Sequence, residues 1–404
     1  MDLIHRWTHG EGKEHREALL KALQSGDPQW PALIVGVPFV DEATGGRDLR
    51  GLDLSGLDLR KAHLDKTRME LANLTEANLK GVSLKRCYLH DARLSKANLQ
   101  QITATGTSFT GAELIGADLR KANLAHCRLA DVDLTGADLK SALLTGIDLT
   151  GADLTDANFA GAKADHAILS RAKGPRFRAP KASFQKARWY KTSLPGADLM
   201  EANLAEANLG FANLKGALLS GACLDHARLR KANLEDADLT GASCQGVHLQ
   251  EAMVGSIQLQ DANLEGAQLN DAQGFSGVNL SRANLKGTDL IGARLTGADL
   301  TGADLTDANL TGALLARCVL SQARLIDANL RQADLSGADL SSCVMTGALL
   351  DNTNLRQSDL TDADLLQSRF IQAWFSMAKV EGARFEDIFR DALGGTIGTP
   401  TFGD

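Results

Sequence analysis

The sequence predicts an all-β solenoid, because one five-residue phrase fills the chain from about Asp48 to Phe385. The phrase is clearest at residues 296–312, TGADLTGADLTDANLTG, and the composition is 44% hydrophobic but only 4% aromatic. Five residues advance an α-helix by about 500°, so successive leucines would never form a stripe on it. In an extended segment, Ala and Leu two apart share one side, and Gly, Asn or Asp suits the following bend. Each phrase therefore predicts one short strand and one corner.

The register of the phrases can be followed along the chain. Central residues recur every fifth position, which gives 46 phrases from Leu49 to Gly274 and 22 from Leu280 to Phe385. One extra residue lies between these two runs, and we assign it to a corner bulge near Phe275. One phrase buries too little surface to be stable alone, so the phrases are expected to wind into coils that stack on one another.

These phrases, as in residues 296–312, resemble the pentapeptide-repeat family, whose members are right-handed quadrilateral parallel β-helices with four phrases per coil. The resemblance implies about 17 coils over residues 47–385, and a rod on the order of 80 Å long at the spacing of neighbouring strands. The family's members perform unrelated functions, so the resemblance specifies the fold more than the activity.

Both ends of the repeat are expected to be covered, because terminal coils expose apolar surface and unpaired strand edges. For the N-terminal segment, residues 1–46, we expect a helix over residues 11–24 and an extended stretch over residues 32–40 that pairs with the first coil. For residues 386–404 we expect a short helix over 386–393 and a frayed tail.

The sequence favours a soluble, cytoplasmic protein that is not an enzyme and uses no cofactor. It contains no apolar run long enough to span a membrane, no signal-peptide pattern and none of the common phosphate-binding or nucleophile motifs. Cys87 and Cys127 would lie two coils apart, roughly 10 Å, which is too far for a disulfide. No metal site is expected at the histidines, which lie too far apart or lack further ligands: His5, His9, His15, His126, His166 and His226.

The strongest local departure in charge is the segment 171–191, which holds eight basic residues and no acidic one. We name these residues the basic belt: Arg171, Lys173, Arg176, Arg178, Lys181, Lys186, Arg188 and Lys191. Clustered cations suit a polyanionic partner, either nucleic acid or an acidic protein surface, with the protein surface favoured. The alternative is internal neutralisation, because Asp153 and Asp198 each fall one coil from a belt residue. The segment could continue the coil or project from it as a loop.

Carboxylates also repeat at twenty-residue intervals on the outside of the expected coils. These acidic ladders are Glu113 with Asp133 and Asp153, Asp118 with Asp138, and Asp339 with Asp359. Carboxylates at roughly 4.8 Å resemble a row of DNA phosphates, about 3.4 Å apart per strand. Some members of the family are DNA mimics that bind bacterial type II topoisomerase (gyrase) and protect it from inhibitors. Against this, the net charge is only −7, and Asp is also a turn residue.

An apolar group near the C-terminus falls on positions that should face outward. Its members are Leu366, Ile371, Trp374 and Met377. Either the C-terminal segment or a second subunit would cover them, and the family resemblance makes an end-to-end homodimer a reasonable expectation.

The sequence thus predicts a rod-like scaffold or adaptor that binds other macromolecules, such as a multi-protein assembly, through its charged faces. Topoisomerase protection by DNA mimicry is the alternative.

Overall fold

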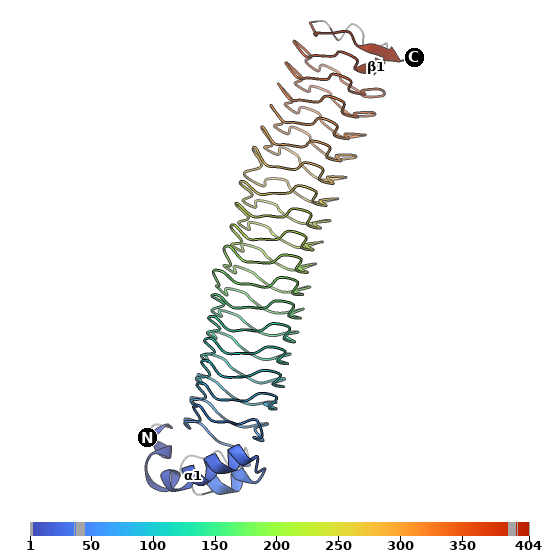
Figure 1. Ribbon diagram of the computed structural model, residues 1–404. Helices are drawn as coiled ribbons and strands as arrows, with labels where there is room; N and C mark the ends of the chain where they lie inside the picture. Colours follow the sequence, from blue (N-terminus) through green and yellow to red (C-terminus); the bar gives the residue numbers. More distant parts are fainter. Residues whose placement is uncertain (1–2, 36, 38–44, 387–392, 394, 404) are drawn as a thin grey trace. The chain divides into compact units, whose positions relative to one another are not determined.

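The computed structural model describes residues 3–35, 37, 45–386, 393 and 395–403, and it divides into two compact units. The first unit comprises residues 1–202 and the second comprises residues 203–404. Each unit is described here by itself. Short helices begin the first unit, and stacked coils follow in both (Figure 1).

Three short helices form the described part of the N-terminal segment. They are η1 (His5–Trp7), α1 (Gly10–Ser25) and η2 (Trp30–Ile34). Helix α1 confirms the expected helix, and it ends at Gly26, whose φ of 81° gives a left-handed C-terminal cap. The expected extended stretch over residues 32–40 is wrong in its first part, because Trp30–Ile34 forms a 3-10 helix with Trp30 and Ile34 buried. Residues 38–40 lie outside the described residues.

In the first unit each coil takes twenty residues, because parallel bridges join each strand position to the one twenty residues later. Asp53 pairs with Asn73, and Asn73 pairs in turn with Arg93. The Leu54 N–H donates to the Asn73 carbonyl of the next coil at 2.7 Å. Almost every phrase makes an equivalent backbone hydrogen bond to the next coil. Four five-residue phrases therefore complete one coil, as the resemblance implied.

The corners need backbone with positive φ, and this requirement explains the fifth position of the phrase. Gly111 has φ 68° and Lys121 has φ 59°, so side chains other than Gly adopt the left-handed region at many corners. The inward Leu and Ala side chains are buried, with Leu124 and Ala122 both fully inaccessible. The expected assignment of Leu and Ala to the inside is confirmed.

Residues 171–191 continue the coil, so the projecting loop is excluded. Lys173 bridges to Asp153 on one side and to Ser193 on the other, and Arg178 bridges to Asn158 and Asp198. The two prolines of this segment fall at the first corner position, where other phrases have no backbone acceptor for the N–H, so the missing donor costs little. Inside the coil, Phe177, Phe184 and Trp189 pack together with ring centroids 4.9 to 6.4 Å apart.

The second unit repeats the same architecture, with one change at the insertion. Bridges advance by twenty residues up to Met253 and Gln273, whereas Gln258 pairs with Asn279, an advance of 21. The inserted residue is Gly274, which is exposed with φ 100°, while Phe275 is buried in the central position. The position of the insertion is confirmed, but the sequence reading wrongly placed Gly274 in the core.

At the C-terminal end of the second unit the chain adds a further layer to the last coil. Strand β1 (Arg384–Glu386) pairs in parallel with β2 (Thr401–Gly403). Thr399 N–H and Oγ1 bond the Glu381 carboxylate at 2.8 and 3.0 Å. The expectation of a frayed tail is therefore wrong, because the unpaired edge of the last coil accepts the tail as a strand. The helix expected over residues 386–393 falls almost wholly outside the described residues.

Candidate functional site

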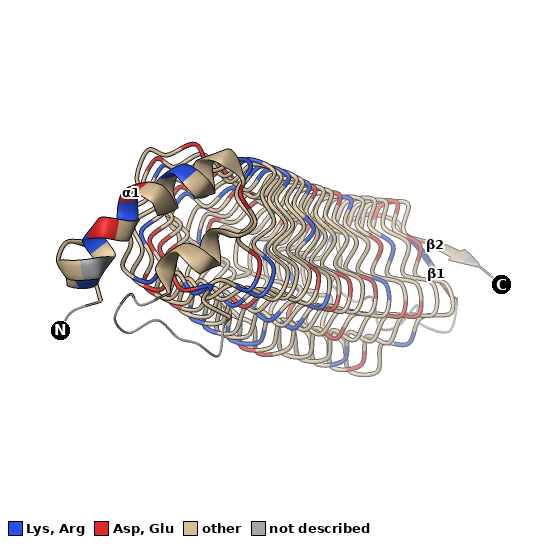
Figure 2. Cartoon of the chain, turned by 90° about the horizontal axis from the view of Figure 1, so that it is seen from below, with Lys and Arg blue, Asp and Glu red and all other residues tan. Residues whose placement is uncertain are grey.

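All eight cations of the basic belt are exposed on the first unit, as their register predicts. Five of them occupy left-handed corners in successive phrases, with φ between 58° and 62°: Arg171, Arg176, Lys181, Lys186 and Lys191. Since four corners complete a coil, the belt places a cation at every corner of one turn. Figure 2 shows that basic and acidic residues also recur from coil to coil elsewhere.

Acidic residues of adjacent coils pair with several cations of the belt. The ion pairs are Lys173 with Asp153 at 3.1 Å, Arg176 with Asp156 at 2.5 Å, Arg178 with Asp198 at 3.9 Å and Lys181 with Glu201 at 3.4 Å. The hydrogen bonds from Arg176 hold the pKa of the Asp156 carboxyl below its usual value. Internal neutralisation therefore accounts for the two pairs that the sequence suggested and for two more.

The remaining belt residues differ in their surroundings. Arg171 and Arg188 make no ion pair with any acid in the described part of the chain. Lys191 places its ammonium 5.4 Å from the Tyr190 ring centroid, which is a cation–π geometry. Arg171, Arg188 and Lys191 thus leave positive charge on the outside of this coil.

The acidic ladders exist as backbone ladders, but their carboxylates are largely used within the protein. Asp153 Oδ1 accepts from the Thr155 N–H at 3.0 Å and from its hydroxyl at 2.6 Å. Asp133, Asp138, Asp339 and Asp359 accept a backbone N–H two residues later in the same way. This geometry is an Asx turn, so the corner role of these aspartates is confirmed.

Cations also lie beside most of the ladder carboxylates. The pairs are Arg93 with Glu113, Arg120 with Asp118 and Asp138, Lys173 with Asp153, and Lys379 with Asp359, at 2.6 to 3.7 Å. A phosphate mimic needs uncompensated negative charge, because the topoisomerase would supply the cations. The ladders therefore offer less negative charge than their spacing alone suggests.

The C-terminal apolar group divides into two parts in the second unit. Ile371, Trp374 and Met377 are 59%, 49% and 55% exposed. Trp374 lies on a strand, and Ile371 and Met377 lie at the corners before and after that strand. Leu366 is half-buried at the preceding corner. The Arg356 guanidinium lies 5.1 Å from the Trp374 ring centroid. Three of the four residues therefore form one exposed apolar side.

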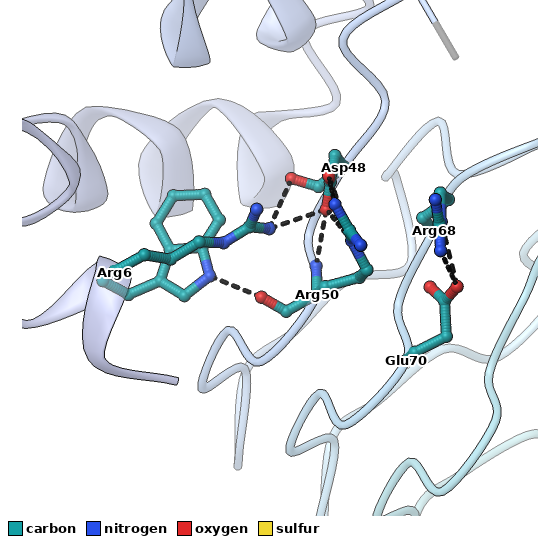
Figure 3. A network of polar contacts seen from close by, with 6 residues as sticks. Arg6, Asp48, Arg50, Arg68 and Glu70 are labelled. Atoms are coloured by element: carbon teal, nitrogen blue, oxygen red, sulfur yellow. Dashed lines mark hydrogen bonds and ion pairs between the residues drawn. The ribbon is translucent and has the colours of Figure 1, made fainter. Parts of the chain in front are cut away.

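The N-terminal segment attaches to the first coil through a buried ion pair that the sequence did not indicate. Arg6 Nη2 lies 2.6 Å from Asp48 Oδ1, and both side chains are fully inaccessible to solvent. The Asp48 carboxylate also accepts hydrogen bonds from Arg50 Nε and Nη2, and the Trp7 indole N–H donates to the Arg50 carbonyl at 2.7 Å (Figure 3). Because Arg6 and Asp48 lie in different segments, no local sequence pattern links them.

The cysteines and histidines form no metal centre among the described residues. The six thiols are free, and burial raises the pKa of Cys87 and Cys127 to about 12. Cys87 Sγ donates to the Leu64 carbonyl at 2.8 Å, as expected for a core residue. Within the part of the chain that the structure describes, no helix combines the length and apolar character that a bilayer crossing requires.

Comparison with known proteins assigns the class. The family model for pentapeptide repeats matches eight times, at residues 53–91, 87–125, 133–171, 182–221, 217–252, 275–312, 308–347 and 348–387. The chain belongs to the pentapeptide-repeat family, and its fold is that family's right-handed quadrilateral β-helix. No curated protein matches it.

Solved structures of the same family are similar to this chain. HetL, from the cyanobacterium Nostoc sp. strain PCC 7120 and involved in heterocyst differentiation regulation, is 28% identical, with 75% of this chain and 92% of HetL covered and a TM-score of 0.18. QnrB1, a plasmid-mediated fluoroquinolone resistance protein, is 17% identical, with coverages of 63% and 96% and a TM-score of 0.23. Rfr23 from Cyanothece 51142 is 23% identical, with coverages of 34% and 92% and a TM-score of 0.16.

Proposed function

We propose that this protein is a non-enzymatic scaffold or adaptor, which binds other macromolecules through its charged outer faces. The observation that carries the proposal is the ring of exposed cations around one coil, in which Arg171 at a corner and Arg188 on a strand make no ion pair with a described acid. The backbone of a hydrogen-bonded coil is already ordered, so binding costs little backbone entropy, and charges of one sign on it suit a protein partner of opposite charge.

We place one β-helix of about 17 coils over residues 47–385, covered by residues 1–46 and 386–404, in the cytoplasm. The exposed side formed by Ile371, Trp374 and Met377 would meet a second copy in an end-to-end homodimer. A monomeric mass by light scattering, unchanged in Trp374→Glu, would refute the dimer.

Affinity purification from the native cell tests the scaffold. The double variant Arg171→Ser, Arg188→Ser should lose the partners that the wild type captures, because it removes the unpaired cations of the belt. Lys13→Ser, Lys21→Ser is the matched control, since both lysines are exposed on α1 and the change in net charge is equal. Identical partner profiles for the two double variants would exclude the belt as the binding surface.

The second candidate is protection of a type II topoisomerase by DNA mimicry. The in-register ladders favour it, because Glu113, Asp133 and Asp153 bridge in succession on one side of the first unit. Their internal hydrogen bonds and cation partners make it the weaker candidate. A supercoiling assay with a fluoroquinolone decides: inhibition unchanged by added protein would refute mimicry, and relief of inhibition would support it.

A further inference from the structure

One side of the first unit is far more basic than the belt alone indicates. This basic face comprises seven-residue stretches that recur every twenty residues from 60–66 to 180–186, so each stretch stacks on the previous one. The seven stretches hold 12 Lys or Arg and 2 Asp, whereas the rest of residues 47–202 holds 12 Lys or Arg and 16 Asp or Glu. The positive excess of these coils is therefore concentrated on one side.

The cations of the basic face point to solvent. All 12 are exposed, and residues 60–186 are described throughout. Ion pairs engage Arg60 with Asp58, Arg120 with Asp118, and Lys181 with an acid of the next coil. Eight others make no ion pair with a described acid: Lys61, Lys66, Lys80, Lys85, Arg86, Lys121, Lys140 and Lys163.

The two acids within the face are occupied by hydrogen bonds of the coil. Asp65 Oδ1 accepts from the Lys85 N–H at 2.9 Å, and Asp165 Oδ1 accepts from the Gln185 N–H at 3.1 Å and from the Ser183 hydroxyl. Both aspartates are half-buried. They hold neighbouring coils together and are poorly placed to neutralise the cations of the face.

The cations of the face lie along the stack of coils, and this arrangement indicates which class of polyanion the face can bind. Most of its cations lie at the two corners that border each stretch, with Lys163 on the strand between them. The row at the first corner runs along the stack for roughly 30 Å, at about 4.8 Å per coil, with no cation at 100–101 or 160–161. The second corner holds cations only at Lys66, Lys85, Arg86 and Lys186, and a strand of three or four residues separates the two corners by about 10 to 13 Å. The major groove of B-DNA is about 12 Å wide and is bordered by phosphate rows.

The face carries no exposed Phe, Tyr or Trp, since Phe184, the one such residue within its stretches, is buried, and its only exposed rings are those of His63, His126 and His166. Unpaired bases bind by stacking on such rings, so the face suits backbone phosphates better than single strands. We propose that the basic face binds double-stranded nucleic acid through its phosphates, without reading its sequence. The proposal extends the proposed function by naming a partner class, and it depends on that function only in treating the protein as a binding surface.

Fluorescence anisotropy with a labelled 30-base-pair DNA duplex tests the proposal, with the full chain in 50 to 200 mM salt. The test variant is Lys80→Gln, Lys85→Gln, Lys140→Gln, Lys163→Gln, all at exposed positions without positive φ. The matched control is Lys13→Gln, Lys21→Gln, Lys215→Gln, Lys286→Gln, which changes net charge equally, lies outside the face and the belt, and uses exposed positions without positive φ. Circular dichroism checks that each variant keeps the fold.

Wild type and control should bind the duplex with a steep salt dependence. The test variant should bind at least tenfold more weakly in 50 mM salt, and its log–log salt slope should fall by about 3 to 4, since each phosphate contact contributes about 0.9. Equal losses in both variants, no binding by the wild type, or stronger binding of poly-glutamate than of the duplex would each overturn the proposal. The last result would identify an acidic protein partner, and partners captured through Arg171 and Arg188 would still support the scaffold.

Discussion

The buried pair of Arg6 and Asp48 should determine whether the N-terminal helices stay attached to the first coil. Asp48→Asn keeps the size of the side chain and one acceptor oxygen, but removes the charge that neutralises Arg6. Leaving one charge of a buried pair uncompensated costs about 3 to 5 kcal/mol. Because the amide still accepts a hydrogen bond and Arg50 can turn toward solvent, we expect the lower end, about 3 kcal/mol.

Hydrogen exchange of the α1 amides measures this effect locally, whereas a urea melt would mix the unfolding of both units. A loss of about 3 kcal/mol accelerates exchange roughly 100-fold where the helix opens before it exchanges. Asp58→Asn is the matched control, because Asp58 makes the same 2.6 Å pair with Arg60 on the exposed surface. Surface pairs contribute little, so this control should leave α1 protection unchanged.

Equal protection in wild type and Asp48→Asn would refute the reasoning that the buried charge pair holds the segment in place. A second variant distinguishes the effect of the buried charge from the effect of the hydrogen bonds and packing around it. Arg6→Met, Asp48→Asn removes the stranded cation, and should recover part of the lost protection if burial of an unpaired charge is the cause. No recovery would indicate that the hydrogen bonds of Asp48, and not its charge, hold the segment.

Three further outcomes follow from the structure. Asp351→Asn should destabilise the second unit at neutral pH, because the Arg369 hydrogen bonds lower the pKa of Asp351. The difference should begin to shrink as pH falls below the usual carboxyl pKa near 4 and vanish only below the lowered pKa of the folded state, which urea melts at several pH values would check. Leu305→Ala should lower the free energy of unfolding by about 2 to 5 kcal/mol, because it opens a void in the core. Thr306→Ala loses one half-exposed hydrogen bond and should lower it by about 1 kcal/mol. Equal urea midpoints for the two variants would contradict the assignment of Leu305 to the inside and Thr306 to the outside. A thiol reagent at pH 8 should label only the half-exposed Cys223 before unfolding, and labelling of all six thiols in the native protein would refute their burial.

The repeat could be predicted from the sequence because its information is local and redundant. Every phrase carries the same alternation of inward and outward side chains, and stacking by twenty residues then places Lys173 beside Asp153. The inserted residue was assigned one position too late, since Gly274 and Phe275 give the same number of phrases and only packing distinguishes them. Pairing of the C-terminal tail with the last coil depends on the edge of that coil, which no pattern in residues 395–403 reveals.

The sequence predicts where the charged residues of the interaction surfaces lie, but not which of their charges remain available to a partner. The belt was visible as a run of cations along the chain, whereas the basic face is scattered over stretches twenty residues apart and becomes visible only when the coils are stacked. Similarly, the spacing of the ladders followed from the phrase, but the hydrogen bonds that occupy Asp153 and its equivalents depend on the geometry of each corner.

The left-handed corners have a consequence for how such a surface can change. A side chain other than Gly costs about 1 kcal/mol there, and no Val, Ile or Thr occurs at positive φ among the described residues. Lys121 occupies such a site, where Gly would relieve the strain. Most corner side chains also point to solvent at a regular spacing, so the outer surface could be changed by single substitutions at the corners without altering the buried leucines.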